Sequence, residues 1–392
     1  MRKFAFAAFL SINLLGKVRI HLYTARFLRN VVFKTILLLI AANLVFSAFS
    51  SLDGLGRMSA YNVLFPGRER LPFGEDPQHS YNLSLYNLEA MFASHILNEK
   101  NKPEDEYRVL LIGDSSVWGT LLRPEQTLSG QLNVMNLSVC DRRIKSYNLG
   151  YPTISLLKDL MILEIAMRYQ PDLIIWSFTL EAFLRSRQFT SPIVANNSIR
   201  VRHLIDSYDL KLDPRHPDLV DLNLWQRTIF GRRRELADLI RLQVYGVLWA
   251  ATGIDQFYSS RYEPAARDLE ANLDYHGWQP PELPADELAF DLLESGLRIA
   301  EGVPVLFVNE PMLISHGKNS DIRYNFFYPR WAYDDYRNQL IKLSQQRGWR
   351  LLDLWDLLPE TEFTNSAIHL TPAGQMIVAR RVGEWIAAQA CP

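Results

Sequence analysis

The chain has 392 residues, of which 48% are hydrophobic and 22% are charged, so it can bury a sizeable core beneath an ordinary globular surface. Its formal net charge of -1 argues against a dedicated nucleic-acid-binding protein, which would normally be basic. The two cysteines, Cys140 and Cys391, allow at most one disulfide, and we expect two unpaired thiols.

The first predicted element is a helix that spans a membrane. Residues 1–52 contain seven Lys or Arg residues and no Asp or Glu, and the stretch from Thr35 to Leu52 carries no charge. That stretch is close to the minimum length for crossing a bilayer, and Val31 to Phe33 extend it. Because the basic residues precede the span, the positive-inside rule predicts a cytoplasmic segment over residues 1–30, an anchor over 31–52 and an extracytoplasmic body.

Two other interpretations of this segment remain open. A cleavable signal peptide would have a shorter basic region, although Ala48 and Ser50 would suit a cleavage site. A buried helix of a soluble protein would not explain the one-sided charge. A second apolar run, from Phe4 to Leu15, is short for a span and is predicted to lie along the membrane surface.

The rest of the chain alternates between short apolar runs and helical patterns. Residues 53–104 are predicted to form a linker, rich in Gly and Pro over 54–80, followed by a leading helix over 81–98. The predicted strands are 107–113, 145–149, 172–178, 303–308 and 349–354, and the predicted helices are 153–169, 285–301, 332–347 and 372–389.

This alternation predicts an α/β fold with three layers, α/β/α, around a five-stranded parallel sheet. The third and fourth strands are separated by residues 184–284, which are predicted to form a helical insertion in a domain that covers 105–392. Within it, Arg232 to Arg234 precede an apolar helix at 235–251. These arginines could contact lipid headgroups or an anionic glycan, but a solvated helix start is the favoured interpretation.

Two short motifs carry candidate chemistry. Gly113-Asp114-Ser115-Ser116 follows the first strand directly, and a serine at such a turn is held at the edge of the sheet beside the free N–H groups of the next helix. His369 lies in a loop just before the last helix, and histidine is the usual base for a serine nucleophile because it titrates near neutral pH.

The order of these motifs on an α/β chain resembles the SGNH (GDSL-type) hydrolase family over roughly residues 105–390, the insertion excepted. The resemblance implies a flavodoxin-like fold in which Ser115 attacks the substrate carbonyl and His369 accepts its proton. It further implies an oxyanion hole formed by the Ser115 and Gly150 backbone N–H groups. The family places an oxyanion-binding glycine after its second strand, where this chain has Asn148-Leu149-Gly150.

The chain departs from the family at two positions. Where the family carries an oxyanion-binding Asn after the third strand, this chain has Glu181, which cannot donate a hydrogen bond when ionised, so Thr179 is a candidate substitute. Where the family has an Asp three residues before the histidine, this chain has Ser366, with Asn365 beside it. His369 is then oriented by Ser366 or by a backbone carbonyl, which would make the pair a Ser–His dyad.

The remaining polar candidates are weaker. Asn309 follows the fourth strand and could contact substrate or simply close a loop, and Asp114 and Asn365 are further candidates for orienting the site. Asp353 and Asp356 are predicted to be structural. No histidine outside the motif has metal-ligand spacing and no phosphate-binding loop occurs in the sequence, so neither a metal nor another cofactor is expected.

Three functions follow from these features. The preferred one is an extracytoplasmic serine esterase or acyltransferase that acts on ester-linked acyl groups of a cell-envelope glycan, with a small or lipid ester as a further substrate. Anchored relatives in the family modify cell-surface polymers in this way, which is an argument by analogy. The alternative is a catalytically inactive accessory protein in envelope polysaccharide modification. A nucleotide-binding protein is third, because no phosphate fingerprint follows the first strand.

Overall fold

The computed structural model describes residues 25–48, 51–65, 70–71, 86–98, 101–254 and 261–388. The chain divides into two compact units. The smaller unit combines Met1–Ser50 with Leu222–Arg233, and the larger unit comprises Ser51–Asp221 and Arg234–Pro392.

A six-stranded sheet with the order β2-β3-β1-β4-β5-β6 lies at the centre of the larger unit. Its strands are β1 (Glu106–Ile112), β2 (Ser138–Val139), β3 (Arg142–Asn148), β4 (Leu173–Phe178), β5 (Val305–Asn309) and β6 (Arg350–Asp353). All pairs are parallel except β2 with β3. The five parallel strands therefore run in the flavodoxin-like order 2-1-3-4-5, which confirms the predicted fold class. The sixth strand, β2, has two residues and is too short for a sequence pattern to reveal.

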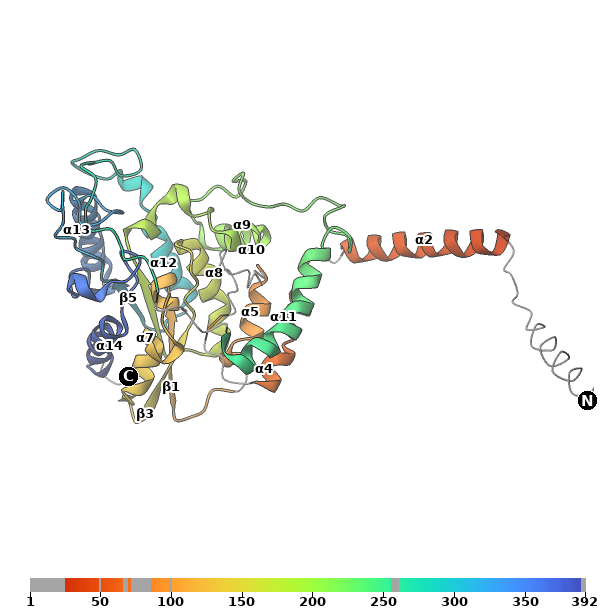
Figure 1. Cartoon of the computed structure of the whole chain (residues 1–392), viewed down its shortest axis with the longest axis horizontal. Helices are drawn as coiled ribbons and strands as arrows, with labels where there is room; N and C mark the ends of the chain where they lie inside the picture. The colour runs from red at the N-terminus through yellow and green to blue at the C-terminus, as the bar shows by residue number, and fades with distance from the viewer. Residues whose placement is uncertain are drawn as a thin grey trace, which may run out of the picture. The chain divides into compact units, whose positions relative to one another are not determined.

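Helices cover both faces of this sheet (Figure 1). The main ones are α5 (Leu88–Ala93), α7 (Leu128–Val134), α8 (Leu156–Ala166), α12 (Phe290–Ile299), α13 (Arg330–Arg347) and α14 (Pro372–Ala387). One core cluster contains side chains of α8, α12 and α13 and the other contains those of α7 and α14. Successive residues of β4 point alternately into the two clusters, with Trp176 in the first and Ile175 in the second. Burial on both faces explains why β4 and β5 are nearly continuous apolar runs.

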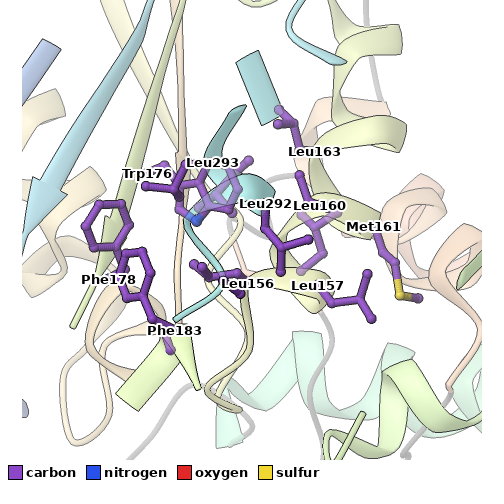
Figure 2. Packing of buried hydrophobic residues seen from close by; sticks show 14 of the residues in the cluster. Leu156, Leu157, Leu160, Met161, Leu163, Trp176, Phe178, Phe183, Leu292 and Leu293 are labelled. Carbon is purple, nitrogen blue, oxygen red and sulfur yellow. The ribbon is translucent and has the colours of Figure 1, made fainter. Parts of the chain in front are cut away.

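The α8 side of the core shows how a local sequence pattern becomes packing. The Ser155 hydroxyl accepts a hydrogen bond from the Lys158 N–H at 3.2 Å and so caps α8 at its N-terminus. Leucines of α8, including Leu156 and Leu160, then pack with Trp176 and with Leu292 of α12 (Figure 2). The Trp176 indole N–H donates to Asp159 at 3.0 Å, which satisfies its one polar group inside the core.

Segments outside the sheet differ from the prediction in their boundaries. The leading helix predicted over 81–98 is reduced to α5 and a 3₁₀ turn at Ile96–Asn98, while 81–85 lie outside the described residues. The linker contains α3 (Asp53–Gly56) and α4 (Ala60–Leu64). The insertion contains α9 (Pro192–Ala195), α10 (Ser198–Tyr208) and α11 (Arg233–Thr252), and the last of these agrees closely with the helix expected at 235–251.

The N-terminal apolar segment forms α2 (Ala25–Ala48). Residues Phe27–Ala48 are long and apolar enough to cross a membrane, by length and composition. The helix begins before the predicted start of the anchor at 31 and ends before its predicted end at 52. The run from Phe4 to Leu15 lies outside the described residues.

One expectation about the cysteines is wrong. Cys140 is disulfide-bonded, whereas the low cysteine count favoured unpaired thiols. The sequence holds one other cysteine, Cys391, which lies outside the described residues. A count of two cysteines does not tell whether a disulfide forms, so the sequence could not reveal this bond.

Candidate active site

The candidate nucleophile, Ser115, lies at the sharp turn between β1 and the short helix α6 (Ser115–Trp118). The Asp114 carboxylate caps this helix by accepting a hydrogen bond from the Ser116 N–H at 2.8 Å. A side chain at Gly113 would meet the Ser177 carbonyl at 2.9 Å and Val117 at 2.6 Å, so only glycine allows β1 to turn this closely against β4. The turn therefore holds the Ser115 hydroxyl at the carboxyl end of β1.

His369 reaches this serine across 254 positions of the chain. Its Nε2 atom lies 2.8 Å from the Ser115 Oγ. The histidine is the third residue before α14, whose N-terminus is capped by the Thr371 hydroxyl, which accepts from the Gly374 N–H at 3.0 Å. The two residues that the sequence selects as nucleophile and base thus lie within hydrogen-bond distance, as nucleophilic catalysis requires.

Asn365 is the second side chain that contacts the histidine. Its side-chain Oδ1 lies 2.8 Å from the His369 Nδ1, and the bond between the Thr364 N–H and the His369 carbonyl, at 2.8 Å, closes the loop that holds both residues. An amide oxygen accepts but cannot donate, so the Nδ1 carries the proton and the Nε2 is left to accept the Ser115 proton. The arrangement is a Ser–His–Asn triad. Among the described residues, Ser366 makes no hydrogen bond to the histidine.

Burial lowers the pKa of His369 to about 4, because removal from water disfavours the imidazolium ion. A carboxylate at the position of Asn365 would counter this effect, as the Asp of a Ser–His–Asp triad does, but an amide carries no charge. His369 is therefore neutral at physiological pH, which is the state in which an imidazole can accept a proton.

The three predicted oxyanion donors are placed differently. The Ser115 backbone N–H is the first of its helix and makes no hydrogen bond with any residue that the structure describes, so it is available. The Gly150 N–H donates to the Asn148 side chain at 3.0 Å. Glycine is required there by packing, since a side chain would meet the Trp118 backbone N at 2.3 Å. The Thr179 hydroxyl is fully buried and pairs with the Tyr328 hydroxyl at 3.1 Å.

Glu181 is held in a polar network of its own. Its carboxylate accepts hydrogen bonds from Arg187 and from the Tyr275 hydroxyl, and it pairs with His276 at 3.1 Å. Burial alone would raise the pKa of Glu181, but the hydrogen bond and charge of His276 and the charge of Arg187 hold that pKa below its ordinary value. The ionised side chain thus takes part in a network with partners from the insertion instead of acting as an oxyanion donor.

Asn309 is a structural residue. It is fully buried, its amide N–H donates to Asp353 at 2.7 Å, and its carbonyl accepts from the hydroxyls of Tyr333 and Tyr336 at 3.3 and 3.1 Å. With its donor and acceptor engaged inside the protein, Asn309 has the contacts expected of the structural alternative. Asp353 also pairs with Arg337, which agrees with its predicted structural role.

A buried charged cluster behind the serine was not predicted. Lys158 is fully buried, and its ammonium group donates to the carbonyls of Gly113 at 2.7 Å and Tyr151 at 3.2 Å. It also lies 2.6 Å from the Asp159 carboxylate. Burial raises the pKa of Asp159 to about 6 against the opposing charge of Lys158. The ammonium group fixes the backbone immediately before the nucleophile and at the Gly150 loop. A Lys-Asp pair inside the apolar helix LLKDLMILEIA is the sequence signal that could have revealed it.

Glu310 completes this cluster. Its carboxyl group accepts hydrogen bonds from the hydroxyls of Ser116 and Ser177. Burial, and then the nearby charge of Asp114, raises the pKa of Glu310 well above its ordinary value. The raised pKa favours the neutral form of this carboxyl group, which holds the turn through its contact with the Ser116 hydroxyl. The sequence showed only that it follows β5. No group of His, Cys, Asp and Glu suited to a metal ion occurs among the described residues.

Comparisons with known proteins give structural likeness and no sequence match. No family model matches the chain. No curated protein matches it either. Solved structures similar to it include a lipolytic G-D-S-L family protein from Veillonella parvula, with 9% identity, coverage of 72% of this chain and 99% of that one, and a TM-score of 0.34.

Two further structures are similar to the same extent. A carbohydrate acetylesterase family member from Sinorhizobium meliloti has 12% identity, with 72% of this chain and 99% of that chain covered and a TM-score of 0.30. The aryl esterase of M. smegmatis has 11% identity, the same coverage and a TM-score of 0.31. TM-scores below 0.5 are too low to bear on function, so the functional argument rests on the residues of the site.

Proposed function

We propose that the chain is a membrane-anchored serine esterase or acyltransferase that cleaves ester-linked acyl groups on the outer side of the membrane. The observation that carries the proposal is the continuous chain of contacts from Ser115 through His369 to Asn365, with both distances at 2.8 Å. A serine whose hydroxyl meets a neutral, oriented imidazole at the end of a parallel strand has the geometry of an activated nucleophile.

The reaction follows from these contacts. The Ser115 oxygen attacks the ester carbonyl carbon as its proton moves to the His369 Nε2. The carbonyl oxygen becomes an oxyanion that the Ser115 N–H stabilises, and the Gly150 N–H joins it if the Asn148 side chain yields. The C–O bond to the alcohol then breaks, and the imidazolium returns the proton to the leaving oxygen. Water completes hydrolysis by the same steps in reverse, whereas an acceptor hydroxyl completes transfer.

Two features support the extracytoplasmic placement. Seven basic residues and no acidic ones occur in residues 1–52, on the side that the positive-inside rule keeps in the cytoplasm. The disulfide at Cys140 suits an oxidising compartment. A glycan of the cell envelope is the polymer that a site anchored there would meet, and we propose its acyl esters as substrates. Short esters such as p-nitrophenyl acetate serve as the first probes.

Covalent labelling tests the proposal. The full chain in detergent micelles is treated with a fluorophosphonate probe, and wild type is compared with Ser115→Ala, His369→Ala and, as a control, Ser366→Ala. Labelling is expected in wild type and in the control and should be absent from the other two variants. Wild type that is folded but unlabelled would contradict a catalytic function.

A second candidate function is a non-catalytic accessory protein in glycan modification. It is favoured by one observation, the occupied oxyanion donors: the Gly150 N–H is engaged by Asn148 and the Thr179 hydroxyl by Tyr328. Under this alternative, an acylated oligosaccharide would bind to wild type and to Ser115→Ala with equal affinity and would be released unchanged from both. Isothermal titration followed by mass spectrometry of the ligand separates the two functions.

A further inference from the structure

The segment before α11 has an unusual composition. Residues 222–234 read LNLWQRTIFGRRR, with four arginines, no acidic residue, and Leu, Trp, Ile and Phe among them. Soluble surface loops seldom combine exposed aromatic groups with a uniform positive charge. Both properties are typical of segments that lie at the interface of an anionic membrane, where Trp occupies the headgroup level and Arg meets phosphate.

This segment belongs to the same compact unit as the anchor helix. The Phe230 N–H donates to the Asn43 side chain at 3.4 Å, close to the C-terminal end of α2. In the same region of α2, Asn43 and Ser47 are buried, whereas the residues before them are exposed. Residues 222–233 therefore lie at the end of the helix that the positive-inside rule places at the outer membrane surface.

The aromatic side chains of the segment are exposed. Trp225 is 67% exposed and Leu224 65%, and the Trp225 and Phe230 rings are nearly parallel with centroids 6.4 Å apart. A stacked aromatic pair has little conformational freedom left to lose on binding. Exposed and rigid apolar groups of this kind indicate a contact surface more than a solvated loop.

The helix that follows continues the apolar surface. On α11, Ile240 is 66% exposed, Val244 55% and Leu248 54%, and their spacing of four residues places them on one stripe of the helix. The opposite side of α11 is buried at Leu239 and Leu242. The helix is thus apolar on two sides, and only one of them faces the core of its own unit.

A second chain segment of the larger unit lies beside this helix. The Gln243 side chain donates to the Met58 carbonyl at 3.0 Å and accepts from the Ala60 N–H at 2.6 Å, which fixes α11 against the start of α4. Val63 of α4 is 82% exposed and Leu64 62%. The apolar surface therefore comprises two segments, each of which is joined to the anchor unit by a short stretch of chain.

We propose that residues 222–252 dock on the outer leaflet of the bilayer through two separate surfaces, the Leu222–Arg233 segment of the smaller unit and the exposed stripe of α11 in the larger unit, which together are called the docking element. The partner is the lipid surface itself, because the element joins a spanning helix and combines apolar side chains with arginines that match anionic headgroups. The body of the protein is then held to the membrane by the anchor and by this second contact, which restricts its active site to substrates near the surface. The proposal rests on the anchor and does not require catalysis.

Spin labelling of the full chain in nanodiscs of neutral and anionic lipid tests this proposal. Single cysteines are introduced as Leu224→Cys and Leu248→Cys in the docking element, Leu38→Cys in α2 and Val134→Cys on α7, where a 65% exposed apolar residue provides an aqueous control. The unsubstituted chain measures background labelling. Accessibility to oxygen, which concentrates in lipid, is compared with accessibility to a water-soluble nickel chelate.

The oxygen-to-nickel ratio is expected to be severalfold higher at positions 224 and 248 than at 134. Combining Arg232→Glu, Arg233→Glu and Arg234→Glu should lower the ratio in anionic nanodiscs, whereas Arg380→Glu with Arg381→Glu on α14 should not. A lipid-like ratio at position 38 together with water-like ratios at 224 and 248 would overturn the proposed docking element. This outcome includes the case in which another protein, instead of lipid, covers the element in cells. A water-like ratio at 38 would refute the anchor instead.

Discussion

The residues that support Ser115 and those that support His369 differ in chemical character. Ser115 stands on a buried charged cluster that contains Lys158, Asp159 and Glu310. His369 is held by the uncharged amide of Asn365, which is itself exposed. A Ser–His–Asp triad has its carboxylate beside the base, whereas here the carboxyl groups lie behind the nucleophile.

This contrast separates positioning from charge stabilisation. The cluster behind Ser115 fixes backbone atoms: Lys158 bonds the Gly113 carbonyl, and Glu310 accepts from the Ser116 hydroxyl. The partner of His369 fixes a ring orientation and a tautomer without supplying a counter-charge to the imidazolium ion. We expect changes behind the serine to act mainly on folding and changes beside the histidine to act mainly on rate and pH dependence.

The largest effect is expected for Lys158→Met. Removal of the Lys158 ammonium group leaves Asp159 and two carbonyl groups buried without this partner. Breaking a buried ion pair typically costs about 3–5 kcal/mol. The free energy of unfolding, measured by chemical denaturation of the full chain in detergent, should fall by that amount. Lys342→Met on the exposed side of α13 is the control and should change it little. Equal stability of the two variants would mean that the cluster does not hold the turn.

Asn365→Ala is expected to reduce kcat/KM for a short ester by about tenfold. The loss corresponds to one neutral hydrogen bond of about 1 to 1.5 kcal/mol that orients the imidazole. Ser366→Ala, one residue along the same loop, should retain wild-type kinetics. If the effects of the two substitutions were exchanged, Ser366 would be the orienting residue, as the sequence alone suggested.

Asn365→Asp should change the pH dependence more than the maximal rate. A carboxylate beside His369 favours the imidazolium ion and should raise the pKa of the histidine by about 1–3 units. The acidic limb of the kcat/KM profile should move to higher pH by the same interval. Ser366→Asp introduces the same charge without the contact to Nδ1 and should shift the limb less.

Glu310→Gln is expected to have the smallest effect. The pKa of Glu310 is raised in the folded state, so that state binds its proton more tightly and stability decreases as pH rises above about 4.5, the ordinary value. Glutamine retains the acceptor oxygen and does not titrate, so the variant should fold at least as stably as wild type at pH 7. Glu310→Leu leaves the Ser116 hydroxyl unpaired and should cost about 1–3 kcal/mol. A large loss of stability in Glu310→Gln would contradict the raised pKa of Glu310.

The sequence was informative where a pattern is local and repeated. Buried strands on both faces of the sheet produce continuous apolar runs, so YRVLLIG and DLIIWSF were located to within a residue or two as β1 and β4. The turn at Ser115 and the loop at His369 were found from short motifs at characteristic places. The distance of 2.8 Å between the Ser115 Oγ and the His369 Nε2 depends on the order of the strands in the sheet. No local sequence pattern contains that order.

The sequence was least informative where a side chain's partner is distant. Glu181 was expected to disturb an oxyanion, yet it is neutralised by Arg187 and by His276, which is 95 residues away. Asn309 looked available at a strand end but is satisfied by Asp353 and two tyrosines of α13. Asn365 was a candidate orienting residue but ranked behind Ser366, because family spacing directed attention to the third residue before the histidine instead of the fourth.

The most direct test of this account is the pH dependence of Ser115 labelling in the wild-type chain. The second-order rate constant for fluorophosphonate modification is measured between about pH 3.5 and 9, with Ser115→Ala as the blank. Because the pKa of His369 is lowered to about 4, the rate should lose half of its plateau value only near that pH. A midpoint near the ordinary histidine value of 6.5 would show that burial does not depress the pKa of His369 and would contradict a base without a counter-charge.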